Sequence, residues 1–412
     1  MQFLTGNAVI GQSGGPTAAI NSSLAGVISE LFKHDSVRTV YGMRNGIEGF
    51  LREDLIDLTS VFSGDDAAGK LELLSHTPAS ALGSCRKKLP KPQDDPEFYE
   101  NLIALFKKYD IRYFFYIGGN DSMDTVTKLT EYTKIHDYEI SVIGVPKTID
   151  NDLCGTDHTP GFGSCAKYIA TTVQEIIRDC AVYTVPAVTI VEIMGRDAGW
   201  LTVSAGLGRL VTGYAPDYIY LPERAFSLDD FLDDVKRALE IHPNVVIAVS
   251  EGLRDADGVY VGERSQSGVA DVFGHKYLSG TGKALELYVK EKIGCKVRSV
   301  ELNISQRCAA HIASKTDIDE AFEVGSAAAC AAISGATGCM MSIERISSEP
   351  YAVTYAPKEI ASIANAVKTV PDEYINAEGN NVTDSALTYI LPLIDGEVDL
   401  KYRCGLPEIF VF

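Results

Sequence analysis

Short apolar runs alternate with amphipathic helical segments along most of this 412-residue chain, and the alternation limits the folds that it can adopt. The runs have the length and composition of buried strands, and the segments between them carry apolar residues at helical spacing. Because parallel strands need a crossover that is usually a helix, the alternation predicts parallel sheets with helices on both faces. Strands are expected at 8–10, 39–42, 113–117, 140–145, 187–193, 218–221, 245–249 and 297–302, and helices at 18–24, 97–109, 122–136, 228–241, 282–293 and 318–334, with a further helix ending near 178.

The length of the chain indicates more than one structural unit, because 412 residues are too many for one ordinary hydrophobic core. We therefore predict an α/β fold with two doubly wound, mostly parallel-sheet lobes and an active-site cleft between them. The approximate division gives an N-terminal lobe at 1–179 and a second lobe at 180–412, and the lobes are allowed to exchange elements. Residues 253–278 are polar and glycine-rich, and we expect them to form a mobile surface segment.

The charge and the cysteine content exclude several classes of protein. The formal net charge is −19, which argues against nucleic acid or an anionic membrane as a partner, because both require a basic surface. The nine cysteines lack CxxC spacing and indicate reduced thiols rather than a disulfide framework or a zinc site. No apolar run reaches the roughly 20 residues of a membrane span, and residues 1–7 lack the features of a signal peptide, so a cytoplasmic location is expected.

Residues 146–152 place a cation, a hydroxyl and two carboxylates directly after the apolar run at 140–145. The proline that opens this stretch favours extended backbone in the residue before it, so the polar residues should lie in a loop at the carboxyl end of a strand, where open α/β sheets bind ligands. Asp150 can take a proton from a hydroxyl, and Lys147 can neutralise a phosphate. The alternative is an Asx-type turn formed by residues 150–152.

Two stretches near the N-terminus have a composition that suits an anion. A glycine turn at 11–17 joins a predicted strand to a predicted helix, and such a turn lets backbone N–H groups approach a phosphate at the helix N-terminus. A tight turn that needs glycine only for its shape is an equal alternative. The basic loop at 82–88 contains Arg86 in an otherwise acidic protein, and its alternative is a solvated surface.

Two further polar stretches follow predicted strands. Residues 118–122 include Asp121, whose simplest role is to cap the helix that begins there. Residues 194–200 include Arg196, whose planar guanidinium suits a phosphate, although an ordinary surface ion pair is the common role of an arginine at a strand end. Parallel strands bring their carboxyl ends to one edge of a sheet, so these stretches should face the predicted cleft.

Five short stretches, taken together, closely resemble the 6-phosphofructokinase family. They are Gly14–Gly15, Gly118–Ser122, Pro146–Asp152, Met194–Arg196 and Gln306–Arg307, and in order they cover about the first three-quarters of the chain. The resemblance implies a phosphofructokinase-like fold and the reversible transfer of a phosphoryl group to the 1-hydroxyl of fructose 6-phosphate. Such a reaction depends on positioning and charge neutralisation more than on covalent catalysis.

The resemblance also implies roles for individual residues, divided between donor, acceptor and metal. Asp150 corresponds to the catalytic base, in a catalytic group that also contains Lys147, Thr148 and Arg196. Positions matching the phosphoryl donor are Gly14, Gly15, Arg86, Asp121 and Lys147. Positions matching the sugar phosphate are Thr148, Asp150, Met194, Gly195, Arg196, Glu251, Arg298 and Arg307. Positions matching the metal are Asn120 and Asp121.

The side chains at Asp121 and Lys147 favour pyrophosphate as the donor. In the ATP-using branch of the family both positions are glycine, which leaves room for the α-phosphate of a nucleotide. The carboxylate of Asp121 opposes that phosphate, and Lys147 can stabilise a phosphate leaving group. The chain is therefore similar to the pyrophosphate-dependent branch. An ATP-dependent relative and a non-catalytic sugar-phosphate-binding regulatory subunit are the alternatives.

The metal position departs from the family pattern. Asn120 replaces the usual aspartate associated with magnesium, and a neutral amide is a weaker partner for this hard cation than a carboxylate. The resemblance therefore implies Mg²⁺ held mainly by pyrophosphate and water, with Asp121 as a possible contributor.

Two positions near the sugar phosphate also depart from the pattern. Ala187 replaces an arginine, and Ile304 replaces an aromatic residue or histidine, so a longer acceptor such as sedoheptulose 7-phosphate stays open beside fructose 6-phosphate. In the family the residue matching Arg298 comes from an adjacent subunit. This implies a homodimer or homotetramer.

Overall fold

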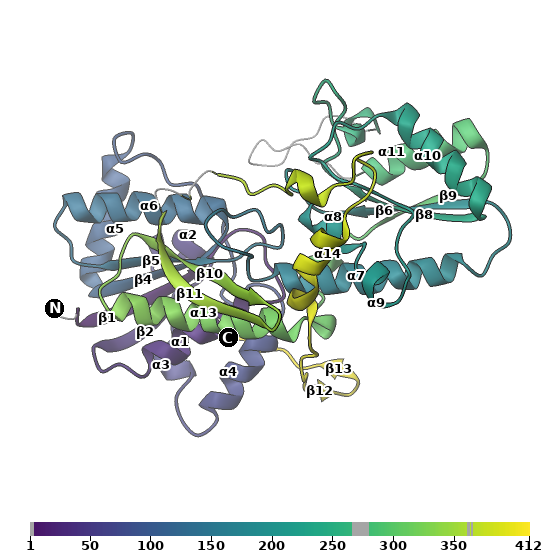
Figure 1. Ribbon diagram of the computed structural model, residues 1–412. Coiled ribbons are helices and arrows are strands. Elements are labelled where there is room, and N and C mark those ends of the chain that lie inside the picture. Colours follow the sequence, from purple (N-terminus) through teal and green to yellow (C-terminus); the bar gives the residue numbers. More distant parts are fainter. Residues whose placement is uncertain (1–3, 266–279, 361–362, 364–365) are drawn as a thin grey trace.

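The computed structural model describes residues 4–265, 280–360, 363 and 366–412, which form two lobes joined by several crossings of the chain (Figure 1). Half of the expected surface segment at 253–278, residues 266–278, lies outside these residues. Each strand and helix predicted from the sequence is confirmed, and the largest difference in length is at α1 (Ile20–Leu31), which continues beyond residue 24. Within the described residues, no helix is both long and apolar enough to cross a bilayer.

The first lobe is built on a seven-stranded sheet with the order β11-β10-β5-β4-β1-β2-β3. The pairs β1–β2, β1–β4, β4–β5 and β5–β10 are parallel, and the two edge strands β3 and β11 are antiparallel to their neighbours. The strand bounds are β1 Gly6–Gln12, β2 Val37–Met43, β3 Leu55–Asp57, β4 Ile111–Gly118, β5 Ser141–Pro146, β10 Cys339–Ser348 and β11 Tyr351–Glu359.

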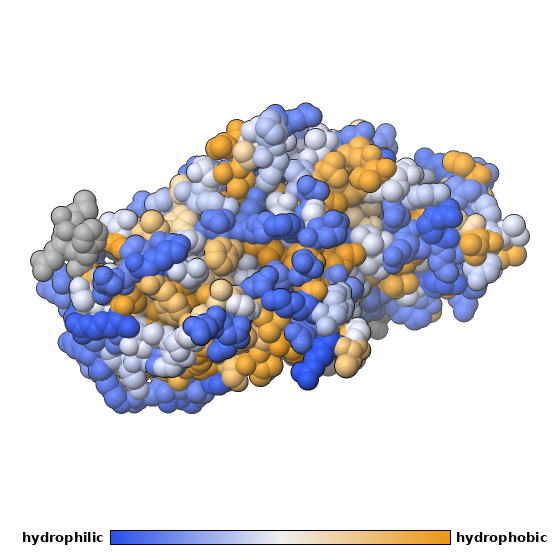
Figure 2. All heavy atoms as spheres, turned by 90° about the horizontal axis from the view of Figure 1, so that it is seen from below, coloured by the Kyte–Doolittle hydropathy of each residue, from blue (hydrophilic) through white to orange (hydrophobic). Residues whose placement is uncertain are grey.

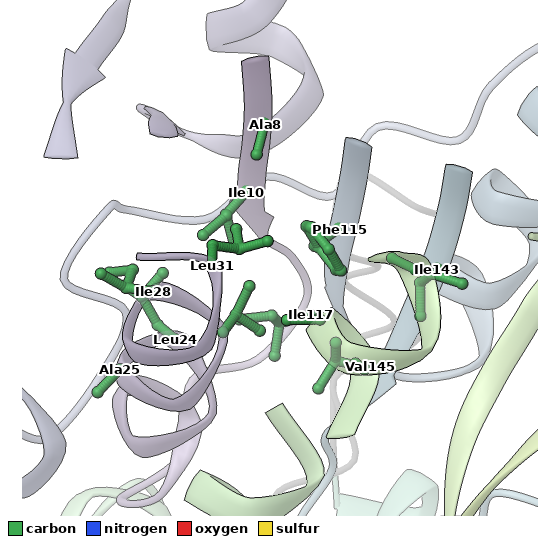
Figure 3. Packing of buried hydrophobic residues seen from close by; sticks show 14 of the residues in the cluster. Ala8, Ile10, Leu24, Ala25, Ile28, Leu31, Phe115, Ile117, Ile143 and Val145 are labelled. Carbon is green, nitrogen blue, oxygen red and sulfur yellow. The ribbon is translucent and has the colours of Figure 1, made fainter. Parts of the chain in front are cut away.

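Helices cover both faces of this sheet. On one face, α1 and α13 (Lys315–Ile333) pack on the central strands, where Leu24 and Ile28 of α1 lie near Ile10 of β1 and Ile117 of β4 (Figure 3). On the other face, α2 (Gly46–Leu51), α5 (Pro96–Lys108) and α6 (Asn120–Ile135) enclose a second apolar cluster. The doubly wound arrangement predicted for this lobe is therefore confirmed.

The second lobe is built on a four-stranded parallel sheet with the order β7-β8-β6-β9. Its strands are β6 Ala187–Ile193, β7 Tyr218–Tyr220, β8 Asn244–Ser250 and β9 Lys296–Glu301. One face packs on a cluster to which α7 (Phe162–Cys180), α8 (Trp200–Ser204) and α14 (Asp384–Ile390) contribute. The other face packs on α10 (Leu228–Ile241) and α11 (Thr281–Ile293).

Short elements complete the chain. The remaining α-helices are α3 Leu58–Val61, α4 Ala67–His76, α9 Gly208–Val211 and α12 Ser305–Cys308; the 3-10 helices are η1 Val261–Ser265, η2 Ala310–Ile312, η4 Asp372–Tyr374 and η5 Leu391–Ile394; and the last two strands are β12 Tyr402–Arg403 and β13 Leu406–Pro407. On the face drawn in Figure 2, apolar and polar side chains are intermixed over both lobes.

Local sequence signals explain where several helices begin. The carboxylate of Asp95 accepts a hydrogen bond from the backbone N–H of Phe98 at 3.1 Å, and Pro96 occupies the first turn of α5, where its missing N–H has no partner to lose. The hydroxyl of Ser227 accepts from the N–H of Asp230 at 3.2 Å and caps α10. These contacts place the ends of helices that the apolar pattern alone locates only approximately.

The two sheets divide the chain differently from the expected boundary near 179. After the second lobe, the chain returns to the first, where α13 packs beside α1 and β10 pairs with β5. Residues 315–359 therefore belong to the first lobe, although the expected division assigned them to the second. The β10–β11 hairpin was also missed. Its place depends on pairing with β5, almost 200 residues earlier in the chain, which local patterns cannot show.

The contact between α1 and α13 needs small residues because the two backbones approach closely. A Cβ atom added to Gly26 of α1 would lie 1.9 Å from the carbonyl oxygen of Phe322, and one added to Gly325 of α13 would lie 2.2 Å from that of Ser23. Neither backbone atom can rotate away as a side chain can. The helices would have to separate.

We predict that Gly26→Ala destabilises the protein by about 1–3 kcal/mol, because the added methyl group overpacks a backbone contact. Urea unfolding followed by circular dichroism measures the change. Gly69→Ala in α4 is the matched control, since the nearest atom to its added Cβ is the movable carboxylate of Asp66 at 2.9 Å. Alanine favours helix, so the control should be neutral or stabilising, and equal losses in both variants would contradict the backbone clash.

Candidate active site

A cleft of about 580 Å³ opens between the lobes at the carboxyl ends of strands from both sheets. Loops after β1, β4 and β5 line it from the first lobe, and loops after β6 and β8 line it from the second. Its lining residues are Gly14, Gly15, Pro16, Thr17, Arg86, Lys88, Gly119, Asn120, Asp121, Ser122, Lys147, Thr148, Ile149, Asp150, Asp152, Met194, Arg196, Asp197, Glu251, Arg307 and Val367. Stretches far apart in the sequence thus meet in one site, as predicted.

Lys147 and Asp150 place opposite charges in this cleft. The Lys147 side chain is 2% exposed, and its ammonium donates a hydrogen bond to the carbonyl oxygen of Gly15 at 2.6 Å. Burial lowers the pKa of Lys147 to about 8, against the opposing effect of Asp150. Burial also raises the pKa of Asp150 to about 7, with further contributions from Asp152 and Glu251, while Lys147 lowers it. Both groups can therefore exchange protons near neutral pH.

The loop that carries these residues has an unusual backbone. The backbone N–H of Asp150 donates to the hydroxyl of Thr148 at 3.1 Å, so the Thr148 side chain closes a turn at 148–150. Asn151 is fully buried and has a positive φ of 53°. Such a conformation costs free energy in a non-glycine residue, and it persists only where surrounding contacts impose it.

One side of the cleft combines the glycine turn with the basic loop. Gly14 has a positive φ of 77°, its N–H donates to the carbonyl oxygen of Cys85 at 3.1 Å, and its carbonyl oxygen accepts from the hydroxyl of Ser84 at 2.6 Å. These contacts hold Arg86 beside the turn, and Arg86 lines the cleft. The basic loop is therefore part of the site rather than only a solvated surface.

Asp121 lies in the first turn of α6 but does not cap it, because Gly119 occupies the cap position. Its carboxylate forms an ion pair with Lys88 at 3.1 Å, and both side chains are more than half exposed. Sequence reasoning did not single out Lys88, although the three consecutive basic residues at 86–88 are a signal that could have identified it.

The second lobe supplies backbone and side-chain groups to the other side of the cleft. The N–H of Met194 donates to the side-chain oxygen of Gln306 at 3.2 Å, and the N–H of Gly195 donates to the Glu251 carboxylate at 3.3 Å. Gly195 has a φ of 125°, and an added Cβ would lie 2.6 Å from the carbonyl oxygen of Ala198, so glycine is needed for this turn. Burial raises the pKa of Glu251. Arg196 and Arg307 line the same side.

Arg298 is a predicted site residue that lies outside the cleft. It belongs to β9, the edge strand of the second sheet, and its guanidinium is 3.9 Å from the carboxylate of Asp179. Both residues line a separate pocket of about 280 Å³. Within one chain, the structure therefore separates Arg298 from the other candidate residues.

Residues 7–332 match the family described as phosphofructokinase. This chain belongs to the phosphofructokinase family. A protein from Methylococcus capsulatus named pyrophosphate–fructose 6-phosphate 1-phosphotransferase is 41% identical over 98% of this chain and 94% of its own length. A protein of the same name from Xanthomonas campestris is 42% identical over 98% and 95%. The solved structure of pyrophosphate-dependent phosphofructokinase from Nitrosospira multiformis is 39% identical, with a TM-score of 0.87 and coverage of 98% of this chain and 95% of that chain.

Magnesium fits the phosphofructokinase cleft if phosphate and water supply most of its ligands. The side-chain oxygen of Asn120 is buried and accepts no hydrogen bond from the described residues, and its nitrogen donates to the Asp152 carboxylate at 3.3 Å. An unused oxygen acceptor of this kind suits a hard cation. Among the described residues no group of three or more His, Cys, Asp or Glu side chains could enclose a metal.

Asp152 and Val367 line the cleft without having been predicted as site residues. The signal for Asp152 was present, because it follows Asp150 by two residues in the same polar loop. Sequence reasoning counted it among the carboxylates of this loop but gave it no role at the site. Val367 had no such signal, because its position depends on an antiparallel bridge to Leu153 across more than 200 residues of chain.

The burial of Lys147 predicts a specific dependence of stability on pH. The folded-state pKa of about 8 lies below the ordinary value of 10.5, so the unfolded state binds more protons between these pH values. The unfavourable contribution of the buried lysine to the free energy of unfolding therefore disappears as pH rises. The free energy of unfolding of wild type, relative to Lys147→Met, should therefore increase by on the order of 3 kcal/mol between pH 7.5 and 10.5. Urea unfolding of both proteins measures it. Lys236→Met, at an exposed lysine, should track wild type at every pH, and a constant difference for Lys147→Met would contradict the prediction.

Proposed function

We propose that this chain is a pyrophosphate-dependent phosphofructokinase that transfers a phosphoryl group to the 1-hydroxyl of fructose 6-phosphate, giving fructose 1,6-bisphosphate and phosphate. The observation that carries the proposal is that two residues line the same cleft: a buried Lys147 beside the glycine turn, and Asp121 at the start of α6. The names of the full-length relatives support the same donor and acceptor. The location of such an enzyme in the cytoplasm stays a prediction.

The residues of the cleft divide the reaction between them. Asp150 accepts the proton of the 1-hydroxyl, whose oxygen then forms a bond to the terminal phosphorus of pyrophosphate. The bond from that phosphorus to the bridging oxygen breaks, and phosphate leaves. Lys147 and Arg86 stabilise the negative charge of the donor and the leaving group, while Arg196 and Arg307 hold the acceptor. When bound, magnesium would supply further charge neutralisation, and Asn120 and Asp121 are the residues that would offer it oxygen ligands.

The donor preference follows from charge and space at Asp121. A nucleotide would bring its α-phosphate toward this carboxylate, and the two negative groups would repel each other in a partly enclosed cleft. Lys88 offsets part of the charge of Asp121, but the carboxylate still occupies the space that the α-phosphate would need. Pyrophosphate has no third phosphate to place there.

Initial rates with pyrophosphate or ATP, each with fructose 6-phosphate and magnesium, test the proposal. Faster turnover with pyrophosphate is expected, and faster turnover with ATP would favour the ATP-dependent alternative. Sedoheptulose 7-phosphate as a second acceptor tests the sugar site in the same assay. Binding of fructose 6-phosphate without turnover on either donor would favour the regulatory subunit.

We further propose that the enzyme is a homodimer that completes its sugar-phosphate site with Arg298 of a second copy. Two observations support this. Arg298 does not line the cleft of its own chain, and β9, on which it lies, is an edge strand with exposed residues along its length. An isologous contact across this edge would carry Arg298 from each copy toward the other.

Asp150→Ala should lower kcat at least 100-fold and leave the KM for fructose 6-phosphate within a few-fold, because a general base acts mainly in the transition state. Steady-state kinetics with pyrophosphate measure both constants. Asp233→Ala, an exposed aspartate on α10, is the control and should match wild type. Near-normal kcat in Asp150→Ala would remove Asp150 from its role as base.

The pH profile of kcat/KM should be a narrow bell. Activity rises as Asp150 loses its proton with a pKa of about 7, and it falls as Lys147 loses its proton with a pKa of about 8. Rates between pH 5.5 and 9.5, corrected for the protonation of pyrophosphate, give the two limbs. A flat profile between pH 6 and 9 would contradict the assigned protonation states.

Mixing two defective variants should restore activity if Arg298 acts in the neighbouring subunit. Neither Asp150→Ala nor Arg298→Ala alone should turn over efficiently at low fructose 6-phosphate. In a mixed dimer, one of the two clefts has both residues intact, so random exchange should return roughly a quarter of wild-type activity. If mixing restores nothing although mass spectrometry detects mixed dimers, Arg298 does not act across the interface.

A further inference from the structure

A short segment at 366–370, here called the strap, runs from the first lobe to the second (Figure 1). On the first-lobe side it pairs with the loop after β5 that carries Lys147, Asp150 and Leu153, here called the catalytic loop. Val367 and Leu153 form an antiparallel bridge, and the backbone N–H of Lys368 donates to the carbonyl oxygen of Asp152 at 2.8 Å. The strap is thus hydrogen-bonded to the loop that carries Asp150.

On the second-lobe side, the strap binds the segment that follows Arg196. The indole N–H of Trp200 donates to the carbonyl oxygen of Lys368 at 2.9 Å. One carboxylate oxygen of Glu223 accepts from the N–H of Gly199 at 2.8 Å and from the N–H of Val370 at 2.9 Å. The same few residues of strap are therefore fixed to both halves of the cleft.

The side chain of Lys368 extends this connection into the catalytic loop. Its ammonium donates to the side-chain oxygen of Asn151 at 3.2 Å and to the carbonyl oxygen of Asp157 at 2.5 Å, and it lies 5.1 Å from the centre of the Trp200 ring. The amide nitrogen of Asn151 donates to the hydroxyl of Tyr389 at 3.3 Å. Asn151 is therefore held on both sides of its amide.

These contacts account for the backbone of the catalytic loop. Asn151 adopts its φ of 53° while fully buried, and the residues on either side of it, Asp150 and Asp152, both line the cleft. Without the contacts from Lys368 and Tyr389, a non-glycine residue would favour a negative φ, which would turn the two carboxylates relative to each other. The family match ends at residue 332, so the strap lies beyond it.

We propose that Lys368 is a positioning residue for phosphoryl transfer. It holds Asn151 so that Asp150 faces the acceptor, and through the strap it fixes the catalytic loop to the second lobe. This inference rests on the proposed function of the cleft. Lys368 itself touches no reacting atom. Its effect should appear mainly in kcat, because loss of a productive orientation raises the barrier more than it weakens binding.

Lys368→Met tests the proposal, since methionine keeps much of the length of the side chain and removes the charge and the donors. We expect kcat with pyrophosphate to fall at least 10-fold, with both KM values within about threefold of wild type. Lys368→Arg, which keeps a cation and its donors, should recover part of the loss. Lys236→Met, at an exposed lysine of α10, is the control and should match wild type. Unchanged kcat in Lys368→Met would overturn the proposal.

A double-mutant cycle separates positioning from a general loss of stability. If Lys368 acts through Asn151, the double variant Lys368→Met/Asn151→Ala should be no slower than the slower single variant, because both changes break one connection. Losses in kcat that multiply would overturn the proposal. If Lys368→Met does not fold, Trp200→Phe replaces it, because that change removes the indole hydrogen bond to the strap and keeps an aromatic ring at this position. A wild-type kcat in this variant would count against the connection.

Hydrogen exchange of the peptide covering 148–154 supplies a readout that does not depend on turnover. Exchange should be faster in Lys368→Met than in wild type and unchanged in Lys236→Met. Absence of wild-type turnover on pyrophosphate and fructose 6-phosphate would reject the proposed function, and the exchange data would still decide whether Lys368 holds the loop. Identical exchange in wild type and Lys368→Met would overturn the positioning role.

Discussion

The structure depends on keeping a cation and a carboxylate together in a cleft that disfavours both charges. Lys147 and Asp150 are brought there by one loop after β5, and burial shifts both pKa values toward neutral pH. An isolated buried charge would be costly, so each group depends on the other, and Lys147 depends also on the carbonyl oxygen of Gly15. Under the proposed function, the same arrangement would give the site a base and a phosphate-binding cation at one end of a strand.

The fold supports this arrangement because a late part of the chain packs back onto the first lobe. The first lobe is completed by α13 and the β10–β11 hairpin, which follow the whole second lobe in sequence. The strap at 366–370 then crosses again and bonds to loops of both lobes. Several crossings restrict the relative movement of the lobes, which suits a reaction that needs two substrates aligned.

Much of the candidate site could be predicted from the sequence, because its residues cluster directly after short apolar runs. Lys147 and Asp150 lie three residues apart, and the rule that ligands bind at the carboxyl ends of parallel strands brought the loops after β1, β4, β5 and β6 to one cleft. Asp121 was placed on the correct helix, but its partner Lys88 was not foreseen. Ion pairs between distant side chains depend on loop geometry, which periodicity does not report.

The sequence by itself determined strands β1, β2, β4 and β5 of the first sheet, all strands of the second sheet, most of the longer helices and the polar stretches that meet in the cleft, because hydrophobic periodicity and short polar motifs are local properties of the chain. Only the tertiary structure decided that residues 315–359 complete the first lobe and that Lys368 reaches Asn151. Each of these depends on residues that are brought together by strand pairing or helix packing over long stretches of chain. Such contacts are selected by the free energy of the whole fold and leave no periodic trace in the segments that make them.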